Sequence, residues 1–174
     1  MNYCLPVQDA SGKYIVLSSG INLCFGEFTD VMERIQKQVE KCGERFLSFD
    51  IKDTGSFMSN GPRYLAYYKN IFLRVPEATI PPNKLKKFVD DVICAQKNGA
   101  IIYITTNSYL LLKYFDLRCK PDTELMFISF YGSGRVYMAK RYKDIERNII
   151  DDVYGELVTE EIRRDSNNGL QIRI

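Results

Sequence analysis

The sequence contains no histidine and no tryptophan among its 174 residues. Without histidine, neither a Ser-His-Asp triad nor a Cys-His pair can form, and histidine metal ligands are excluded. The side chain that most often serves as a general base near neutral pH is missing as well. We therefore expect no catalytic residues of these classes.

A phosphate-binding loop is also missing. Its pattern requires a glycine, four residues, and then Gly-Lys-Ser/Thr. The nearest match is Gly12-Lys13, but Tyr14 follows it and Val7 occupies the position of the first glycine. Without this loop the chain has no segment to cradle the β and γ phosphates of a nucleotide.

Disulfide and zinc sites are not expected either. The five cysteines are odd in number and no two of them have C-x-x-C spacing, so reduced thiols are the ordinary interpretation. No signal peptide is evident, and no apolar run reaches the roughly 18–20 residues of a membrane span. We expect a cytoplasmic protein with no metal, no cofactor and no membrane partner.

The charges are nearly balanced, with 24 basic and 22 acidic residues and a net charge of +2. This balance gives no general attraction to nucleic acid or to anionic membranes. A small basic cluster, Lys84, Lys86 and Lys87, is followed by Asp90 and Asp91, which is typical of a solvated helix face. Nucleic-acid binding through some of the twelve tyrosines is kept as an alternative.

The first part of the chain predicts a short strand, a turn and a long helix. Lys13–Leu17 is β-prone, and Ser18-Ser19-Gly20 after it is a turn and a candidate helix N-terminus. Apolar residues then recur at helical spacing, which predicts an amphipathic helix from about Ile21 to Cys42, ended by Gly43.

The rest of the chain alternates strands and helices. This order predicts right-handed crossovers and a mostly parallel core sheet. Expected strands cover 46–51, 70–75, 100–105, 124–130 and 135–139, and expected helices cover about 85–98, 108–116 and 144–164, the last with a possible interruption at Gly155. The fold class is thus α/β, a mostly parallel sheet flanked by helices, with an antiparallel hairpin over Glu124–Ala139 and one domain over residues 1–174.

Three segments together resemble the C-terminal half of ABC-type ATPases, specifically the RecF/SMC-like proteins of the AAA family that are common in bacterial defence systems. Leu17-Ser18-Ser19-Gly20 is similar to the signature motif of that family. Asn70–Ala78 resembles the Walker B strand and D-loop, and Ile101–Leu111 resembles the strand that carries the switch histidine. The resemblance covers roughly Lys13 to Ile162 and implies a domain that lacks the Walker A half.

The departures from the family pattern imply that this chain is not an enzyme. The Walker B acids, which hold Mg²⁺ and polarise the attacking water, are replaced by Arg74 and Val75. An arginine cannot ligate Mg²⁺ and a valine cannot take a proton. The next residues, Pro76-Glu77-Ala78, are kept, and the switch histidine is replaced by Asn107, which cannot titrate.

Three functional hypotheses are kept, the first two implied by the resemblance. The first is a non-catalytic protein that acts through protein–protein contact, as a regulatory subunit or a decoy for a related ATPase, or by self-association. A decoy would suit a defence or counter-defence role. The second is a nucleotide sensor that contacts ATP in trans through Ser18, Ser19 and Gly20 without hydrolysis, and the third is a nucleic-acid-binding protein.

Each candidate residue also has an ordinary structural interpretation. Ser18-Ser19-Gly20 can be a simple helix cap, and Arg74 can be the solvent-facing end of a strand. Glu77 is expected to hydrogen-bond the loop backbone. Asn107 is expected to cap the helix that starts near Ser108.

Overall fold

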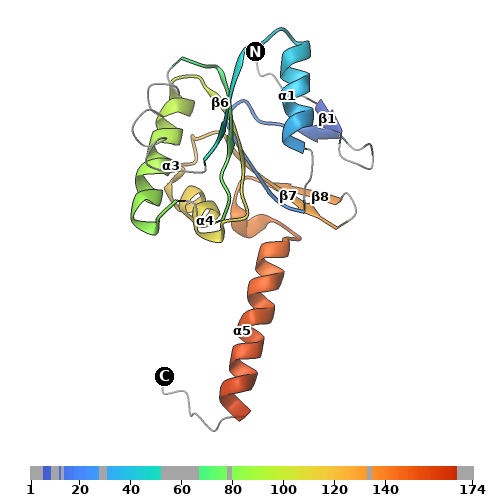
Figure 1. Ribbon diagram of the computed structural model, residues 1–174, viewed down its shortest axis with the longest axis vertical. Coiled ribbons are helices and arrows are strands. Elements are labelled where there is room, and N and C mark those ends of the chain that lie inside the picture. Colours follow the sequence, from blue (N-terminus) through green and yellow to red (C-terminus); the bar gives the residue numbers. More distant parts are fainter. Residues whose placement is uncertain are drawn as a thin grey trace.

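A six-stranded sheet with helices on both faces forms the body of the protein, and one helix extends away from it (Figure 1). The computed structural model describes residues 6–8, 12, 14–27, 31–51, 67–77, 80–132 and 135–167. Five neighbouring strands of the sheet run parallel and the sixth is antiparallel. The expected α/β class with a mostly parallel sheet is therefore confirmed.

The strands of this sheet follow a different order in space than along the chain. In spatial order they are β4 (Phe46–Asp50), β5 (Asn70–Arg74), β6 (Ile101–Thr105), β3 (Ile21–Gly26), β7 (Leu125–Tyr131) and β8 (Arg135–Ala139). A separate antiparallel pair is formed by β1 (Pro6–Gln8) and β2 (Tyr14–Val16). The central strand, β3, is buried along its whole length, as both faces of a parallel sheet require.

Helices cover the two faces of the sheet unequally (Figure 1). The helices are α1 (Val31–Lys41), α3 (Pro82–Lys97), α4 (Tyr109–Arg118), the 3₁₀ turn η1 (Tyr142–Asp144) and α5 (Ile149–Asn167). The buried residues of α3 and α4 share one core cluster with one face of the sheet, and those of α1 share a second cluster with the other face. The chain therefore has three layers with a core on each side of the sheet.

The expected helix from Ile21 to Cys42 is wrong in its first part. Residues Ile21–Gly26 form β3, and only Val31–Lys41 is helical. Ile21, Leu23 and Phe25 are buried on the face beneath α3 and α4, and Cys24 is buried on the other face, so the segment is a strand covered on both sides. Gly43, at φ +72°, follows the helix as expected.

The expected strand at Lys13–Leu17 exists as β2, but it pairs with β1 and does not join the six-stranded sheet. The expected strands and helices from residue 46 to residue 164 are confirmed with small shifts of their ends, and Gly155 does not interrupt α5. The sequence also predicts a short helix at Tyr64–Tyr68 and a last strand at Leu170–Ile174. Residues 64–66, residues 170–174 and the hairpin tip at 133–134 lie outside the described residues.

At the carboxyl ends of the parallel strands, the chain turns into helices on opposite faces of the sheet. β3 leads into α1 on one face, while the adjacent strand β6 leads into α4 on the opposite face. In open α/β sheets, ligands bind outside the carboxyl ends of the strands at such a change of side. The carboxyl ends of β3, β5 and β6 therefore define the first region to inspect for a site.

Candidate functional site

The carboxyl end of β5 carries a cation that is already paired. Arg74 is aligned with Asp50 of β4 and Thr105 of β6 across the sheet. Its Nε lies 3.4 Å from Oδ1 of Asp50, and both side chains are about half exposed. A surface ion pair of this kind contributes little to stability. It leaves a cation at the position where the family pattern places the Mg²⁺-binding acid.

Val75 belongs to the hydrophobic core. Its side chain is 1% exposed and joins the cluster beneath α3 and α4. Its backbone N–H donates to the carbonyl oxygen of Thr105 at 2.8 Å, which extends the pairing of β5 with β6. A side chain in this position faces apolar neighbours, and water that needs activation by a base has no access to it.

Asn107 joins the ends of two strands and does not cap α4. Its Oδ1 accepts a hydrogen bond from the backbone N–H of Gly26 at 2.8 Å, and its Nδ2 lies 3.5 Å from the carbonyl oxygen of the same residue. The cap of α4 is Ser108, whose Oγ accepts from the N–H of Leu111. The expected capping role of Asn107 is therefore wrong.

The structure separates the candidate residues into two groups. Arg74, Val75, Glu77 and Asn107 lie at or just beyond the carboxyl ends of β5 and β6. The turn Ser18-Ser19-Gly20 lies at the opposite edge, because it directly precedes the amino end of β3. A strand of six residues spans about 20 Å, so the two groups cannot act on one small ligand.

The Ser18-Ser19-Gly20 turn also lacks the helix that the signature comparison requires. A strand follows it, so neither the dipole nor the free N–H groups of a helix N-terminus point at a ligand there. The hydroxyl of Ser19 instead donates a short hydrogen bond to Glu124. The N–H of Ser18 donates to Oδ1 of Asn22 at 2.8 Å. These contacts fix the start of β3, and they occupy donors that a γ-phosphate would need.

A pocket of about 530 Å³ lies at this amino edge of the sheet, with Ser18 and Ser19 in its wall. The same wall contains three basic and three acidic side chains: Lys120, Lys140, Arg141, Asp116, Asp122 and Glu124. Opposite charges in equal number do not favour a phosphate. The geometry therefore does not strengthen the nucleotide-sensing hypothesis.

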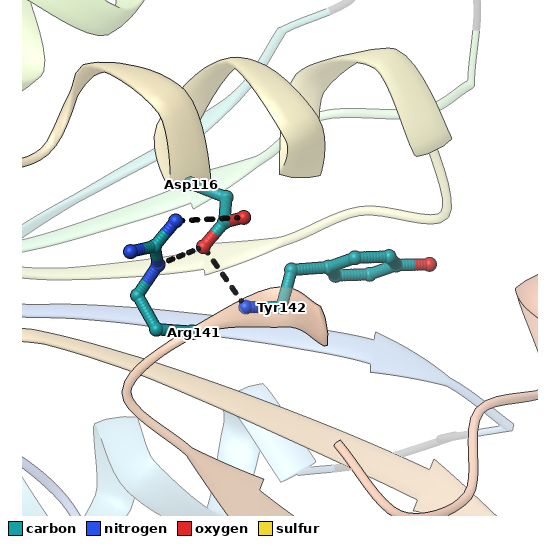
Figure 2. Close-up of polar contacts among 3 residues, drawn as sticks. All are labelled: Asp116, Arg141 and Tyr142. Atoms are coloured by element: carbon teal, nitrogen blue, oxygen red, sulfur yellow. Dashed lines mark hydrogen bonds and ion pairs between the residues drawn. The ribbon is translucent and has the colours of Figure 1, made fainter. Parts of the chain in front are cut away.

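A buried carboxylate fixes the segment that precedes α5 (Figure 2). Asp116 projects from α4, and its side chain is 7% exposed. Its Oδ1 accepts from Nε of Arg141 at 2.7 Å and from the backbone N–H of Tyr142 at 3.1 Å. Burial raises the pKa of the Asp116 carboxyl, but the hydrogen bonds from Arg141 and Tyr142 outweigh it and hold that pKa below its usual range.

Tyr142 connects this carboxylate to the base of α5. Its ring is 1% exposed and lies 5.7–5.9 Å from the rings of Phe25, Phe127 and Tyr109. Its hydroxyl donates to Oδ1 of Asp151, in the first turn of α5, at 2.8 Å. Burial raises the pKa of this phenol, so it stays a neutral donor. The first turn of α5 is therefore anchored in the core.

Most of α5 beyond its first turn is exposed where its side chains are described. Residues 151–164 are all exposed, and the helix extends away from the sheet (Figure 1). One face of it nevertheless carries large apolar side chains at 44–56% exposure: Val153, Tyr154, Leu157, Val158 and Ile162. We call these five residues the α5 stripe. None of the described helices combines the length and apolar character needed to cross a membrane.

The sequence contained the signal for the α5 stripe, because its apolar residues recur at helical intervals. That spacing predicts a helix, but it does not show whether the apolar face is covered. The Asp116–Arg141 pair was missed entirely, since its members lie 25 residues apart. Sequence spacing gave no reason to connect them.

Metal chemistry receives no support from the described part of the chain, where no group of three or more Cys, Asp or Glu could hold an ion. Comparison with known proteins gives no family assignment. No protein-family model matches this chain, and no curated protein matches its sequence. The functional argument therefore depends on the geometry of the chain itself.

Proposed function

We propose that this chain is a non-catalytic protein, similar to ABC-type ATPases, that acts through protein–protein contact, and that the α5 stripe is its contact surface. One observation carries the proposal: the five large apolar side chains of the α5 stripe are 44–56% exposed, and of these Tyr154 contacts the ring of Tyr109 on the body. Contiguous apolar patches on an otherwise soluble surface mark interaction sites.

A helix that extends from the body is stabilised when another protein packs on its apolar face. Helices shorter than about 12–15 residues are marginal in water, and most helical stability in proteins comes from packing of the apolar face. Helix α5 has 19 residues, and its described side chains from 151 to 164 are all exposed, so the body supplies little of that packing. A partner that covers the stripe supplies the packing that the body does not.

The residues at the carboxyl edge support the non-catalytic half of the proposal. Arg74 is a paired cation, Val75 is a core residue, and Asn107 holds the end of β3. Each of these positions has a structural task, and none offers a carboxylate for Mg²⁺ or a base for water. Phosphoryl transfer needs both a positioned metal and a positioned nucleophile.

Two partner classes fit the proposal: an intact ATPase of the resembled family, and a second copy of this chain. In the first case the chain serves as a regulatory subunit or a decoy on the ATPase. In the second it is a self-associating module. Both classes use the same surface, so one experiment on α5 addresses both.

Site-specific photo-crosslinking tests the contact surface. A photoreactive benzophenone residue replaces Leu157 within the α5 stripe, and a matched control replaces Thr159, which lies on the opposite face of the helix. In cells that express the chain naturally, we expect position 157 to give a discrete adduct and position 159 to give none. Mass spectrometry identifies the adduct as the chain itself or as an ATPase of the resembled family.

The outcomes separate the two halves of the proposal. Equal labelling from both positions, or no adduct from position 157, contradicts the contact surface. An adduct with a protein of neither class contradicts the partner assignment. Hydrolysis of ATP by the pure chain in the presence of Mg²⁺, at a rate above that of buffer, contradicts the proposal that the chain is non-catalytic.

A further inference from the structure

We infer that the pocket at the amino edge of the sheet binds a small zwitterion, a molecule such as a short peptide that carries a free ammonium and a free carboxylate. The pocket is separate from the α5 stripe, so this ligand is an addition to the proposed function and does not depend on it. The inference is carried by charges of both signs that line one cavity without pairing with each other.

The cavity has the size and the walls of a small-molecule site. Its volume of about 530 Å³ lies within the range of roughly 300–1,000 Å³ that is usual for ligand pockets. Pro121, Leu125 and Met126 supply apolar wall. The charged side chains come from three separate segments, which are α4, the loop that leads into β7 and the residues after β8. A ligand can therefore bury apolar surface while its charged ends meet the protein.

One pair of charges in this wall is already satisfied. Oδ1 of Asp116 lies 2.7 Å from Nε of Arg141, and the same oxygen accepts the N–H of Tyr142. The side chain of Asp116 is 7% exposed, so the pair is a fixed part of the wall. Binding of a charged ligand is therefore assigned to the other charges.

The other four charges belong to exposed side chains that form no ion pair in the described part of the chain: Lys120, Lys140, Asp122 and Glu124. The carboxylate of Glu124 accepts the hydroxyl of Ser19 and meets no cation. Two positive and two negative charges cancel, so a simple anion or a simple cation gains little from the pocket as a whole. A ligand with both charges is attracted at each of its ends.

A buried hydroxyl in the same wall lacks a hydrogen-bond partner. Thr123 lines the pocket and is 9% exposed, and its Oγ1 has no partner. Buried polar groups in proteins nearly always have one. A carbonyl or carboxylate oxygen of a ligand would supply the acceptor that the chain does not, which favours a peptide over a ligand without such oxygens.

Leucyl-leucine is the probe that tests the site, because its side chains suit the apolar wall and its two ends carry opposite charges. Amide chemical shifts in two-dimensional NMR, recorded at low salt, report both affinity and location. The ligand efficiency usual for small molecules gives an expected dissociation constant of roughly 0.2 mM. The matched probes are N-acetyl-leucyl-leucine, which lacks the ammonium, and leucyl-leucinamide, which lacks the carboxylate. Each should bind at least about tenfold more weakly.

Paired substitutions assign each end of the probe to its side chains. Lys120→Met combined with Lys140→Met should bind leucyl-leucine and its amide equally. Asp122→Asn combined with Glu124→Gln should bind leucyl-leucine and its acetylated form equally. All four side chains are exposed, so these variants should fold, and circular dichroism verifies it. Lys86→Met, an exposed position on α3, is the control and should discriminate among the probes as the unaltered chain does.

The location and the charge dependence can each overturn the inference. Shifts at residues 119–126 and 140–141 support it, and shifts confined to other residues contradict it. Equal or tighter binding of either blocked probe by the unaltered chain overturns the zwitterion assignment. No shift with leucyl-leucine or free leucine at about 10 mM, some fifty times the expected dissociation constant, overturns the site itself. None of these results bears on the α5 stripe, which crosslinking at position 157 tests separately.

Discussion

Helices α3 and α5 both carry apolar faces, but the face of α3 is buried and that of α5 is exposed. In α3 the residues Leu85, Phe88, Val89 and Val92 are at most 3% exposed, beneath the sheet and beside α4. In α5 the stripe residues are 44–56% exposed. The pattern thus identifies which face of a helix needs cover, and the rest of the fold decides whether the same chain supplies it.

The difference follows from how each helix is attached. Helix α3 is held at both ends, by β5 before it and β6 after it, and packs along its length on α4. Helix α5 is held at its amino end by Asn148, by Tyr142 and by the contact of Tyr154 with the ring of Tyr109. A helix anchored at one end can present its face to another molecule.

The same substitution in the two regions should have very different effects. Val75→Glu places a carboxylate in the core beneath α3, where no partner for it exists, and we expect a loss of more than about 4 kcal/mol in the free energy of unfolding. Val158→Glu on α5 should change the stability of the monomer by no more than about 0.5 kcal/mol. Urea denaturation of both variants at low protein concentration measures the two effects.

This pair of variants also addresses the Walker B comparison. Val75→Glu restores the acid of the family pattern, yet it should give an unstable chain without ATP turnover. A stable Val75→Glu protein would show that the position is open to water. The interpretation of Val75 as a core residue would then be wrong.

The sequence predicted the layered fold well from residue 46 onward, because periodicity is a local property. Ala100–Thr105 is a continuous apolar run before a helix, and it forms a buried parallel strand as expected. The error at Ile21–Gly26 shows the limit. The segment is short and lies next to a helical pattern, and its place within the sheet depends on pairing with β6 and β7, which lie far along the chain.

The site was less predictable, because it depends on which segments meet. Asn107 was assigned to a cap from its neighbour in sequence, whereas its partner is Gly26, 81 residues away. The separation of Ser18-Ser19-Gly20 from Arg74 follows from strand direction, which the wrong helix assignment concealed. Exposure of the α5 stripe has no local signature at all.

The attachment of α5 to the body, through Asp116, Arg141 and Tyr142, can be weakened selectively. Asp116→Asn removes the charge that holds Arg141 and the N–H of Tyr142, and we expect a loss of about 1.5–3 kcal/mol in unfolding free energy. The control is Asp90→Asn. Asp90 forms a two-point pair with Arg118, but both side chains are more than a third exposed, so its loss should cost less than about 1 kcal/mol.

The contribution of Asp116 to the free energy of unfolding should decrease as the pH falls. The pKa of Asp116 is lowered in the folded protein, so its contribution is present above the pKa of an unfolded aspartate, about 3.9. It is lost as the pH falls through the folded-state value. The difference in stability between the unaltered chain and Asp116→Asn should therefore be constant near pH 7 and shrink below about pH 4. A difference that does not shrink at all as the pH falls below 4 would contradict the role of the charge.

The smallest expected effect lies within α5 and is a gain. Gly155 is in the middle of the helix, and a Cβ built there meets nothing within 4 Å. Alanine favours a helix interior by about 1 kcal/mol over glycine, so Gly155→Ala should slow hydrogen exchange of the α5 amides by about fivefold. The measurement is made at low protein concentration, where any association contributes least. Exchange that is unchanged by the alanine would mean that α5 is already stabilised by contacts with its own body, and the contrast between the covered helix and the uncovered one would then lose its basis.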